Sequence, residues 1–150
     1  MASVDIAPAT AADLDAIAAL ELLGNRHPWP RSVFAGELAR PHAHLDVGRA
    51  AAGPVVAFCN WWCVAGEVQI HALTAHPDVR RAGIGTQLLA HMLDTGRAAG
   101  ALTATLEVRR SNTPAIALYT RAGFRTGHVR SRYYADNDED ALIMVIEHLV

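Results

Sequence analysis

Two side chains of this sequence, Glu107 and Tyr119, have the chemistry of a proton acceptor and a proton donor. An amine at neutral pH is mostly protonated and must lose a proton before it attacks a thioester, so a nearby carboxylate favours the reaction. A neutral phenol with a reference pKa of about 10 can protonate a thiolate of similar basicity. The two residues are therefore a candidate general base and general acid, and direct transfer without a covalent enzyme intermediate would use both in this way.

Both side chains also have a purely structural interpretation. Strand alternation places Glu107 on the face opposite Leu106 and Val108, where a lone acid is commonly solvated or paired with a cation. Tyr119 shares a helical face with Ile116, so it could simply pack at the edge of a core. Asn112 lies between Glu107 and Tyr119 in the sequence, and a polar residue in register with both favours the functional interpretation.

A second chemical feature is the stretch from His71 to Thr86, which predicts a buried strand, a loop opened by Pro77, and the first turn of an amphipathic helix. Gly83 and Gly85 lack side chains that would keep a ligand away from the main chain, and the free N–H groups of a helical first turn favour anions. The spacing matches neither a P-loop nor a dinucleotide fingerprint. The turn is therefore a candidate phosphate site.

Several short motifs, taken together, resemble a known family. Arg80 to Gly85 matches the Arg/Gln-x-x-Gly-x-Gly/Ala signature of the GNAT family of N-acetyltransferases. The RimI type, the ribosomal-protein-alanine N-acetyltransferases, is resembled by five further segments: His27-Pro28-Trp29, Leu106 to Asn112, Leu118 to Phe124, Tyr133-Tyr134 and Glu139-Asp140-Ala141. The likeness spans nearly the whole chain.

The resemblance implies acetyl-CoA as cosubstrate, with Glu107 as general base and Tyr119 as general acid. It also implies that main-chain groups of Leu73, Thr74 and Ala75 hold the pantetheine arm, and that Asn112 touches the cofactor. The pyrophosphate would lie on the turn formed by Arg81, Ala82, Gly83, Ile84, Gly85 and Thr86. One departure is His76, where relatives usually carry an acidic residue.

The acceptor side is predicted less sharply. Trp29, Tyr133 and Tyr134 are candidate walls of a peptide groove, and the acids from Asp136 to Asp140 either attract a cationic amino terminus or form an ordinary surface loop. His71 is a candidate auxiliary base near the acceptor, although a hydrogen-bonded strand histidine is the more common case. Trp61 and Trp62 face opposite sides of their strand, so at least one belongs to the core.

Composition limits the classes of function. A chain of 150 residues with 51% hydrophobic residues suits one domain, 1–150, and a net charge of -2 argues against direct nucleic-acid binding. Cys59 and Cys63 lie roughly 13 Å apart along a strand, too far to pair, and they make a poor zinc site, so no metal is expected. Without a leader or a long apolar run, the expected location is cytoplasmic, away from membranes.

Periodicity and turn residues predict an α/β (α+β) chain. Strands are expected at Val4–Ala7, Leu45–Arg49, Val55–Val64, Val68–Ala75, Leu102–Val108, Phe124–Val129 and Ala141–His148, and helices at Leu14–Leu23, Ser32–Ala39, Gly85–Ala99 and Pro114–Ala122. The helix between two strands implies a parallel pair. The resemblance implies a mixed, mostly antiparallel sheet with that pair splayed around the cofactor, flanked by about four helices.

The leading hypothesis is an acetyl-CoA-dependent enzyme that acetylates the N-terminal amine of a protein or peptide, with a ribosomal protein as a candidate partner. Two alternatives stay open. An enzyme with the same cofactor site could acetylate a small amine, an amino acid or a lysine side chain. A noncatalytic acyl-CoA-binding module would bind the cofactor without turnover.

Overall fold

A mostly antiparallel sheet runs through the molecule in the strand order β1-β2-β3-β4-β5-β7-β6. The computed structural model describes residues 3–51, 53–80 and 82–149. The strands are β1 (Val4–Pro8), β2 (Ala43–Ala50), β3 (Val55–Val64), β4 (Glu67–Ala75), β5 (Thr103–Arg109), β6 (Arg125–Tyr134) and β7 (Glu139–Ile146). The helices are α1 (Leu14–Gly24), α2 (Arg31–Glu37), α3 (Ile84–Ala98) and α4 (Thr113–Arg121), with short 3-10 turns at Ala11–Asp13 and Pro77–Val79.

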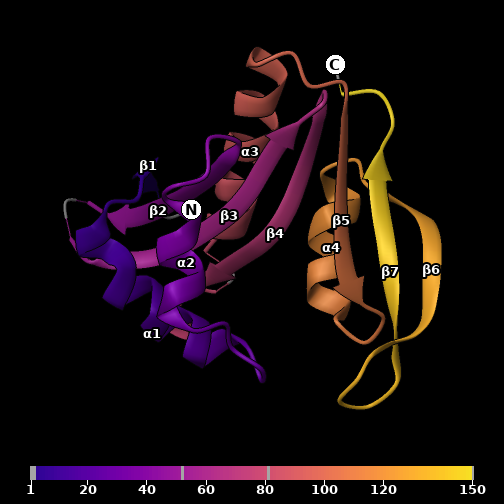
Figure 1. Ribbon diagram of the computed structural model, residues 1–150, viewed down its shortest axis with the longest axis horizontal. Helices are drawn as coiled ribbons and strands as arrows, with labels where there is room; N and C mark the ends of the chain where they lie inside the picture. Colours follow the sequence, from indigo (N-terminus) through magenta and orange to yellow (C-terminus); the bar gives the residue numbers. More distant parts are fainter. Residues whose placement is uncertain (1–2, 52, 81, 150) are drawn as a thin grey trace.

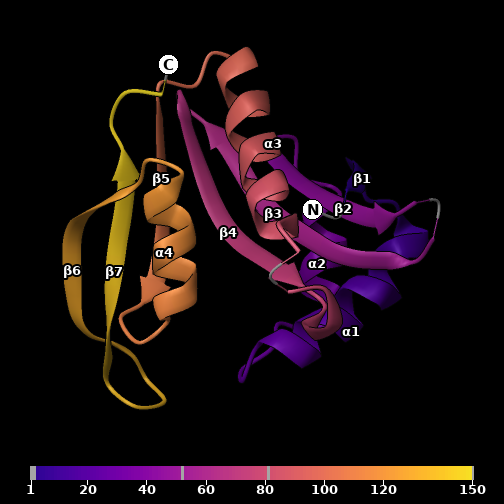
Figure 2. The ribbon, with the colours of Figure 1, turned by 180° about the vertical axis from the view of Figure 1, so that it is seen from behind.

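Helices cover both faces of the sheet. The helices α1 and α2 lie on one face and α3 and α4 on the other (Figures 1 and 2). The α1 side has its own core, formed by Leu14, Ile17, Leu20, Phe34, Leu45, Val47 and Phe58. The α3 side is built on the apolar stripe Leu88, Leu89, Met92 and Leu93, and it also buries Trp61. The predicted mixed, mostly antiparallel sheet with one parallel pair and about four flanking helices is confirmed.

Two predicted inward positions are exposed. The spacing of Leu14, Ile17, Leu20 and Leu23 predicts one apolar stripe on the first helix, but Leu23 is 56% exposed and Glu21 is buried instead. At about 100° per residue, nine residues rotate a side chain to the opposite side of a helix, whereas seven return it nearly to its starting direction. The sequence also predicts that Leu38 faces inward, but it lies just after the end of α2 at Glu37 and is 38% exposed.

The parallel pair β4 and β5 stays together for only part of its length. The paired residues run from Glu67 with Thr103 to Ile70 with Leu106, and the two strands then diverge (Figure 1). A bulge in β4 coincides with this point, because Trp61 of β3 pairs with Ile70 while Asn60 pairs with Ala72, leaving His71 as an extra residue. Bulges bend strands and disrupt their ladders. The bulge therefore accounts for the fork between β4 and β5.

Several element boundaries differ from those that the sequence predicts. The polar stretch from Tyr133 to Asp140 predicts a loop, but β6 runs to Tyr134 and pairs it with Glu139 of β7. Thr113 before Pro114 predicts a helix cap, but the cap of α4 is Asn112, whose side-chain oxygen accepts a hydrogen bond from the Ala115 N–H at 3.3 Å. β7 ends at Ile146, before the predicted His148.

Cys59 and Cys63 are both unpaired thiols, and Cys59 is fully buried in the core beneath α3. No helix among the described residues has the length and apolar character required to cross a bilayer.

Candidate active site

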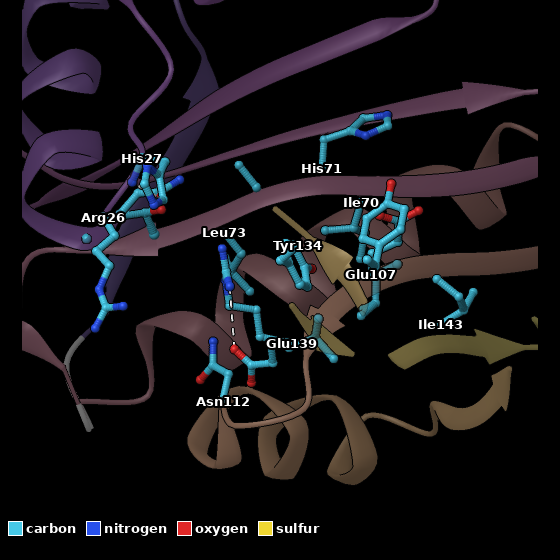
Figure 3. A pocket seen from close by; sticks show the side chains of 18 of the residues that line it. Arg26, His27, Ile70, His71, Leu73, Glu107, Asn112, Tyr134, Glu139 and Ile143 are labelled. Carbon is cyan, nitrogen blue, oxygen red and sulfur yellow. Dashed lines mark hydrogen bonds and ion pairs between the residues drawn. The ribbon is translucent and has the colours of Figure 1, made fainter. Parts of the chain in front are cut away.

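A cleft of about 1170 Å³ opens where β4 and β5 part. It is lined by every residue predicted for proton transfer or acceptor binding: Glu107, Tyr119, Trp29, His71, Tyr133 and Tyr134. Leu73, Thr74 and Asn112 of the predicted cofactor set also line it (Figure 3). The structure therefore brings together side chains from α1–α2, β4, β5, α4 and β6 that are far apart in the sequence.

Glu107 lies at the fork, directly after the last paired residue of β5, with an exposed side chain. The core-facing alternation is as predicted, since Leu106 and Val108 are buried on the other side of the strand. A hydrogen bond with Glu107 and its negative charge raise the pKa of the Tyr133 hydroxyl. Burial, followed by the charge of Glu107, also raises the pKa of Tyr134. The carboxylate thus faces two phenols that stay protonated at neutral pH.

Tyr119 projects from α4 and combines both of its predicted roles. Its ring packs edge-on against Phe124, with centroids 5.9 Å apart, and the residue lines the cleft. Burial raises the pKa of Tyr119 to about 12. The phenol is therefore neutral throughout the physiological range and can donate a hydrogen bond into the cleft.

His71, the bulged residue of β4, is held from behind by an aromatic contact. Its ring lies edge-on to Trp62, with centroids 4.6 Å apart. Burial lowers the pKa of His71, while the negative charges of Glu37 and Glu107 partly oppose this effect. A neutral imidazole is the result near pH 7, at the mouth of the fork.

The walls of the acceptor side are fixed by a buried carboxylate. Glu21, which is 3% exposed, accepts hydrogen bonds from the Trp29 main-chain N–H at 3.0 Å and from the Asn25 side chain at 3.3 Å. The Trp29 ring lies 5.9 Å from Phe34 and remains 40% exposed. Nothing in the sequence singles out Glu21, because a helical acid is normally solvated.

The far part of β4 offers main-chain groups to a ligand. Leu73, Thr74 and Ala75 pair with β3 along one edge, and the β5 ladder on the other edge has already ended at Ile70. An unpaired strand edge presents N–H and C=O groups that an extended ligand can bind. Ala75 differs from its two neighbours because it does not line the cleft; its carbonyl accepts a hydrogen bond from Arg80 at 3.4 Å.

The glycine turn lies at the N-terminus of α3, beyond the cleft itself. Gly83 adopts a left-handed conformation with a φ of 82°, which glycine reaches without strain, and its carbonyl accepts the Gln87 N–H at 3.1 Å. The N–H groups of Ile84, Gly85 and Thr86 precede that first helical bond and suit an anion. Arg81, predicted to join this turn, lies outside the described residues.

Gly85 has a packing role as well, since a Cβ there would meet Leu118 of α4 at 3.2 Å.

His76, where relatives usually carry an acidic residue, caps a short turn as a carboxylate would. Its Nδ1 accepts a hydrogen bond from the Asp78 N–H at 3.1 Å and so caps the short turn Pro77–Val79. The altered charge leaves this local capping intact.

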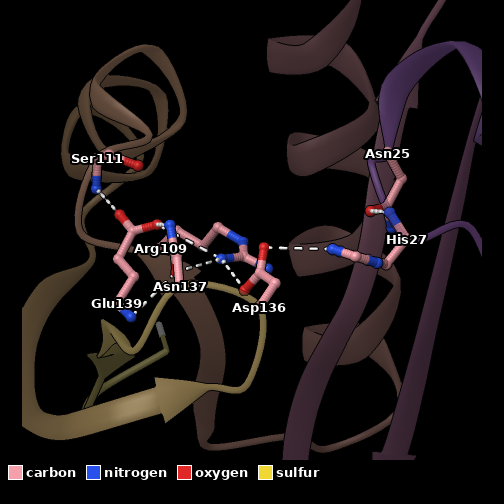
Figure 4. A network of polar contacts seen from close by, with 7 residues as sticks. All are labelled: Asn25, His27, Arg109, Ser111, Asp136, Asn137 and Glu139. Atoms are coloured by element: carbon pink, nitrogen blue, oxygen red, sulfur yellow. Dashed lines mark hydrogen bonds and ion pairs between the residues drawn. The ribbon is translucent and has the colours of Figure 1, made fainter.

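A polar network that the sequence did not predict crosses one end of the cleft (Figure 4). Arg109 of β5 contacts Asp136 at 3.0 Å and Glu139 at 3.4 Å. Asp136 also lies 3.3 Å from His27 Nε2, which joins the β6–β7 turn to the loop between α1 and α2. Arg109 lowers the pKa of Asp136, and a hydrogen bond from Ser111 lowers that of Glu139. These acids are therefore engaged with cations and main-chain donors of the protein itself.

Comparison with known proteins matches this arrangement to a family. The acetyltransferase (GNAT) family model covers residues 14–124. The chain is 35% identical over 136 residues to the [ribosomal protein bS18]-alanine N-acetyltransferase of Salmonella typhimurium, covering 89% of this chain and 90% of the relative. It is also 35% identical over 147 residues to the N-alpha-acetyltransferase RimI of Mycobacterium tuberculosis, covering 94% and 90%.

A solved structure agrees with the sequence relatives. The ribosomal-protein-S18-alanine N-acetyltransferase of Escherichia coli superposes with a TM-score of 0.88 and 32% identity, covering 96% of this chain and 93% of that one. A forked parallel pair, a glycine turn before α3 and a carboxylate beside the fork thus occur in a chain with acetyltransferase relatives along nearly its whole length. The protein belongs to the GNAT family of acetyltransferases and is an N-acetyltransferase.

Proposed function

We propose that the protein transfers the acetyl group of acetyl-CoA to the N-terminal α-amine of a protein or peptide. The observation that carries the proposal is the fork, where one cleft is lined by a carboxylate, a partly buried phenol and the unpaired edge of β4. The relatives named as bS18-alanine N-acetyltransferases support an amino-terminal alanine of a ribosomal protein as the acceptor.

The residues present suit acetyl-CoA. Its pantetheine arm is extended and amide-bearing, so it can add to the free edge of β4 at Leu73 and Thr74 much as another strand would. Its pyrophosphate carries the negative charge that the N-terminus of α3 favours, at Gly83 to Thr86. When bound, acetyl-CoA supplies an activated thioester.

The proposed chemistry is direct attack within a ternary complex. The neutral acceptor nitrogen forms the new N–C bond at the thioester carbon, and Glu107 accepts a proton that this nitrogen loses during the transfer. A main-chain N–H of β4 stabilises the oxygen that becomes negative. Breakage of the C–S bond releases a thiolate, which the Tyr119 hydroxyl stabilises by hydrogen bonding. Trp29, Tyr133 and Tyr134 wall the path of the acceptor chain.

Mass spectrometry of peptides with different amino-terminal residues, incubated with acetyl-CoA and the protein, tests the proposal. We expect the α-amine to be acetylated, and Glu107→Gln to lower kcat by about 10²-fold or more with acetyl-CoA binding retained. Glu147→Gln, an exposed change of the same kind outside the cleft, serves as the control and should leave kcat unchanged.

Two results would contradict the proposal. Modification confined to lysine side chains or small amines would remove the α-amine as acceptor. Acetyl-CoA binding without turnover on any amine would leave only a binding module.

A further inference from the structure

The proposed reaction must remove two protons from one nitrogen. An α-ammonium group carries three N–H bonds, whereas the amide product carries one. The first proton leaves before attack, and the second leaves the positively charged nitrogen of the tetrahedral intermediate. One proton ends on the CoA thiolate and the other is released to water. A site with two proton acceptors near the nitrogen suits this sequence better than a site with one.

Two such groups flank the fork. Ile70 and Leu106 form the last pair of the parallel ladder, and the next residue on each strand is His71 on β4 and Glu107 on β5. Both line the same cleft, and Figure 3 shows them on the two strands at the place where these diverge. His71 is the extra residue of the β4 bulge, which lies at this point.

The residues around His71 hold its imidazole ring in position and leave it able to act as a base. Trp62 of β3 supports the ring edge-on, and the Trp62 indole N–H in turn donates to Glu37 of α2 at 2.7 Å. The Arg40 guanidinium lies over the Trp62 ring, 5.7 Å from its centroid, and pairs with Glu37 at 3.0 Å. The charged groups that act on the imidazole are therefore Glu37 from α2 and Glu107 from β5.

We propose that His71 takes the first proton from the acceptor ammonium and that Glu107 takes the second from the tetrahedral intermediate. The inference rests on the proposed function, whose acceptor is an α-amine. The reference pKa of an α-amine is about 7.7–8.0, that of imidazole about 6.5 and that of a glutamate about 4.3, so imidazole is the better-matched acceptor for the first proton. The nitrogen of the intermediate is far more acidic, so a carboxylate suffices for the second.

The electrostatics of the cleft agree with this order. Desolvation keeps His71 neutral near pH 7 and thus ready to accept a proton. The imidazolium that forms is then stabilised by the negative charges of Glu37 and Glu107. The neutral amine attacks, the C–S bond breaks, and the thiolate gains a proton while hydrogen-bonded to Tyr119.

The pH dependence of kcat/KM for a peptide acceptor tests the assignment. We expect His71→Asn to lower kcat/KM by roughly 5- to 10-fold at pH 7, where about a tenth of an α-amine with a pKa of about 7.7–8.0 is already neutral, and to approach the wild type above about pH 8, where the free amine no longer needs the first base. Glu107→Gln should instead lower the rate across the whole range. His128→Asn, on the exposed strand β6 outside the cleft, is the matched control and should follow the wild-type profile.

Imidazole added to His71→Ala separates proton transfer from support of the fold. We expect partial recovery of kcat with KM for acetyl-CoA unchanged. A His71→Asn profile parallel to that of the wild type, or no recovery with imidazole, would overturn the inference. The wild-type rate on peptides reports separately on the proposed function: if only another amine is acetylated, the α-amine assignment fails, and the ratio of variant to wild-type rates on that amine still decides the role of His71.

Discussion

Tyr119 illustrates how burial changes the role of a single side chain. A phenol at its reference pKa could pass its proton to a thiolate of similar basicity, but burial raises the pKa of Tyr119 to about 12. The reference pKa of a cysteine thiol is about 8.5, so the raised pKa of Tyr119 makes full proton transfer from this phenol to a thiolate unfavourable. Tyr119 is therefore better suited to hold the leaving thiolate by a hydrogen bond than to give up its proton permanently.

Tyr119→Phe tests that role by removing the hydroxyl while keeping the ring contact with Phe124. We expect kcat to fall by about 10- to 100-fold with little change in melting temperature, because one hydrogen bond to a developing charge is lost. In the wild type, the phenol should stay protonated and active to well above pH 10, since its pKa is raised.

The kcat profile between pH 8 and 11 is the measurement for Tyr119. An alkaline decline in this range that disappears in Tyr119→Phe would show that the phenol ionises near its reference value and would contradict the burial argument. Phe124→Leu, which alters the packing partner without touching the hydroxyl, distinguishes a packing defect from loss of the hydrogen bond.

Contact between α3 and β4 sets the distance from the glycine turn to the fork. Gly96 lies near the end of α3, and a Cβ at this position would meet the Val68 side chain at 2.2 Å. Helix and strand can approach this closely only without a side chain at residue 96. The sequence showed a glycine inside a helical stretch, which costs helix propensity, and the packing supplies the reason for it.

Gly96→Ala should therefore destabilise the fold by about 1–3 kcal/mol through overpacking, despite the better helix propensity of alanine. Urea denaturation monitored by tryptophan fluorescence is the measurement. Gly36→Ala in α2 is the matched control, because a Cβ at Gly36 meets no atom within 4 Å. The control should be neutral or stabilising by about 0.4–1 kcal/mol. Equal stability of the two variants would contradict the close contact.

Across the whole molecule, the His27–Asp136 contact connects the two sides of the cleft. It joins the loop after α1 to the turn between β6 and β7, which otherwise belong to different arms of the fork (Figure 4). The Arg109 guanidinium lowers the pKa of Asp136, so the carboxylate stays charged at neutral pH. The stabilisation from this charge is fully present above the unfolded carboxyl pKa of about 3.9 and is lost as the pH falls through the lower folded value.

Asp136→Asn weakens this connection while keeping the size of the side chain. We expect KM for the peptide to change by several-fold, with KM for acetyl-CoA and the melting temperature nearly unchanged, because the pair is screened by solvent and the cofactor edge lies on β4. Steady-state kinetics with each substrate varied in turn is the measurement. Asp94→Asn, which breaks the exposed Asp94–Arg97 pair on α3, is the control. Unchanged peptide KM would show that the contact does not shape the acceptor path.

The sequence was sufficient for the local order of the elements, and the residues it nominated for proton transfer and acceptor binding line one cleft. Alternation identified the buried face of β5, and glycines at positions 83 and 85 marked the start of α3. The order of the motifs predicts that Glu107, Tyr119 and Asn112 belong to one site, and all three line one cleft. These features depend on spacing within a short stretch of chain, which sequence alone contains. Leu23 shows the limit, because an interval of three residues drifts around a helix over several turns.

The sequence by itself determined which residues could donate a proton, accept a proton or bind a phosphate. It also determined the crossover connection that places β4 beside β5 in a parallel pair. Only the tertiary structure decided that the ladder stops after Ile70 and Leu106, that His71 is bulged beside Glu107, and that Arg109 and His27 engage the acidic turn. The raised pKa of Tyr119 and the lowered pKa of His71 likewise come from burial among distant segments. Bulges, ion pairs and desolvation arise from contacts between strands and loops far apart in the chain, and no local pattern of residues encodes them.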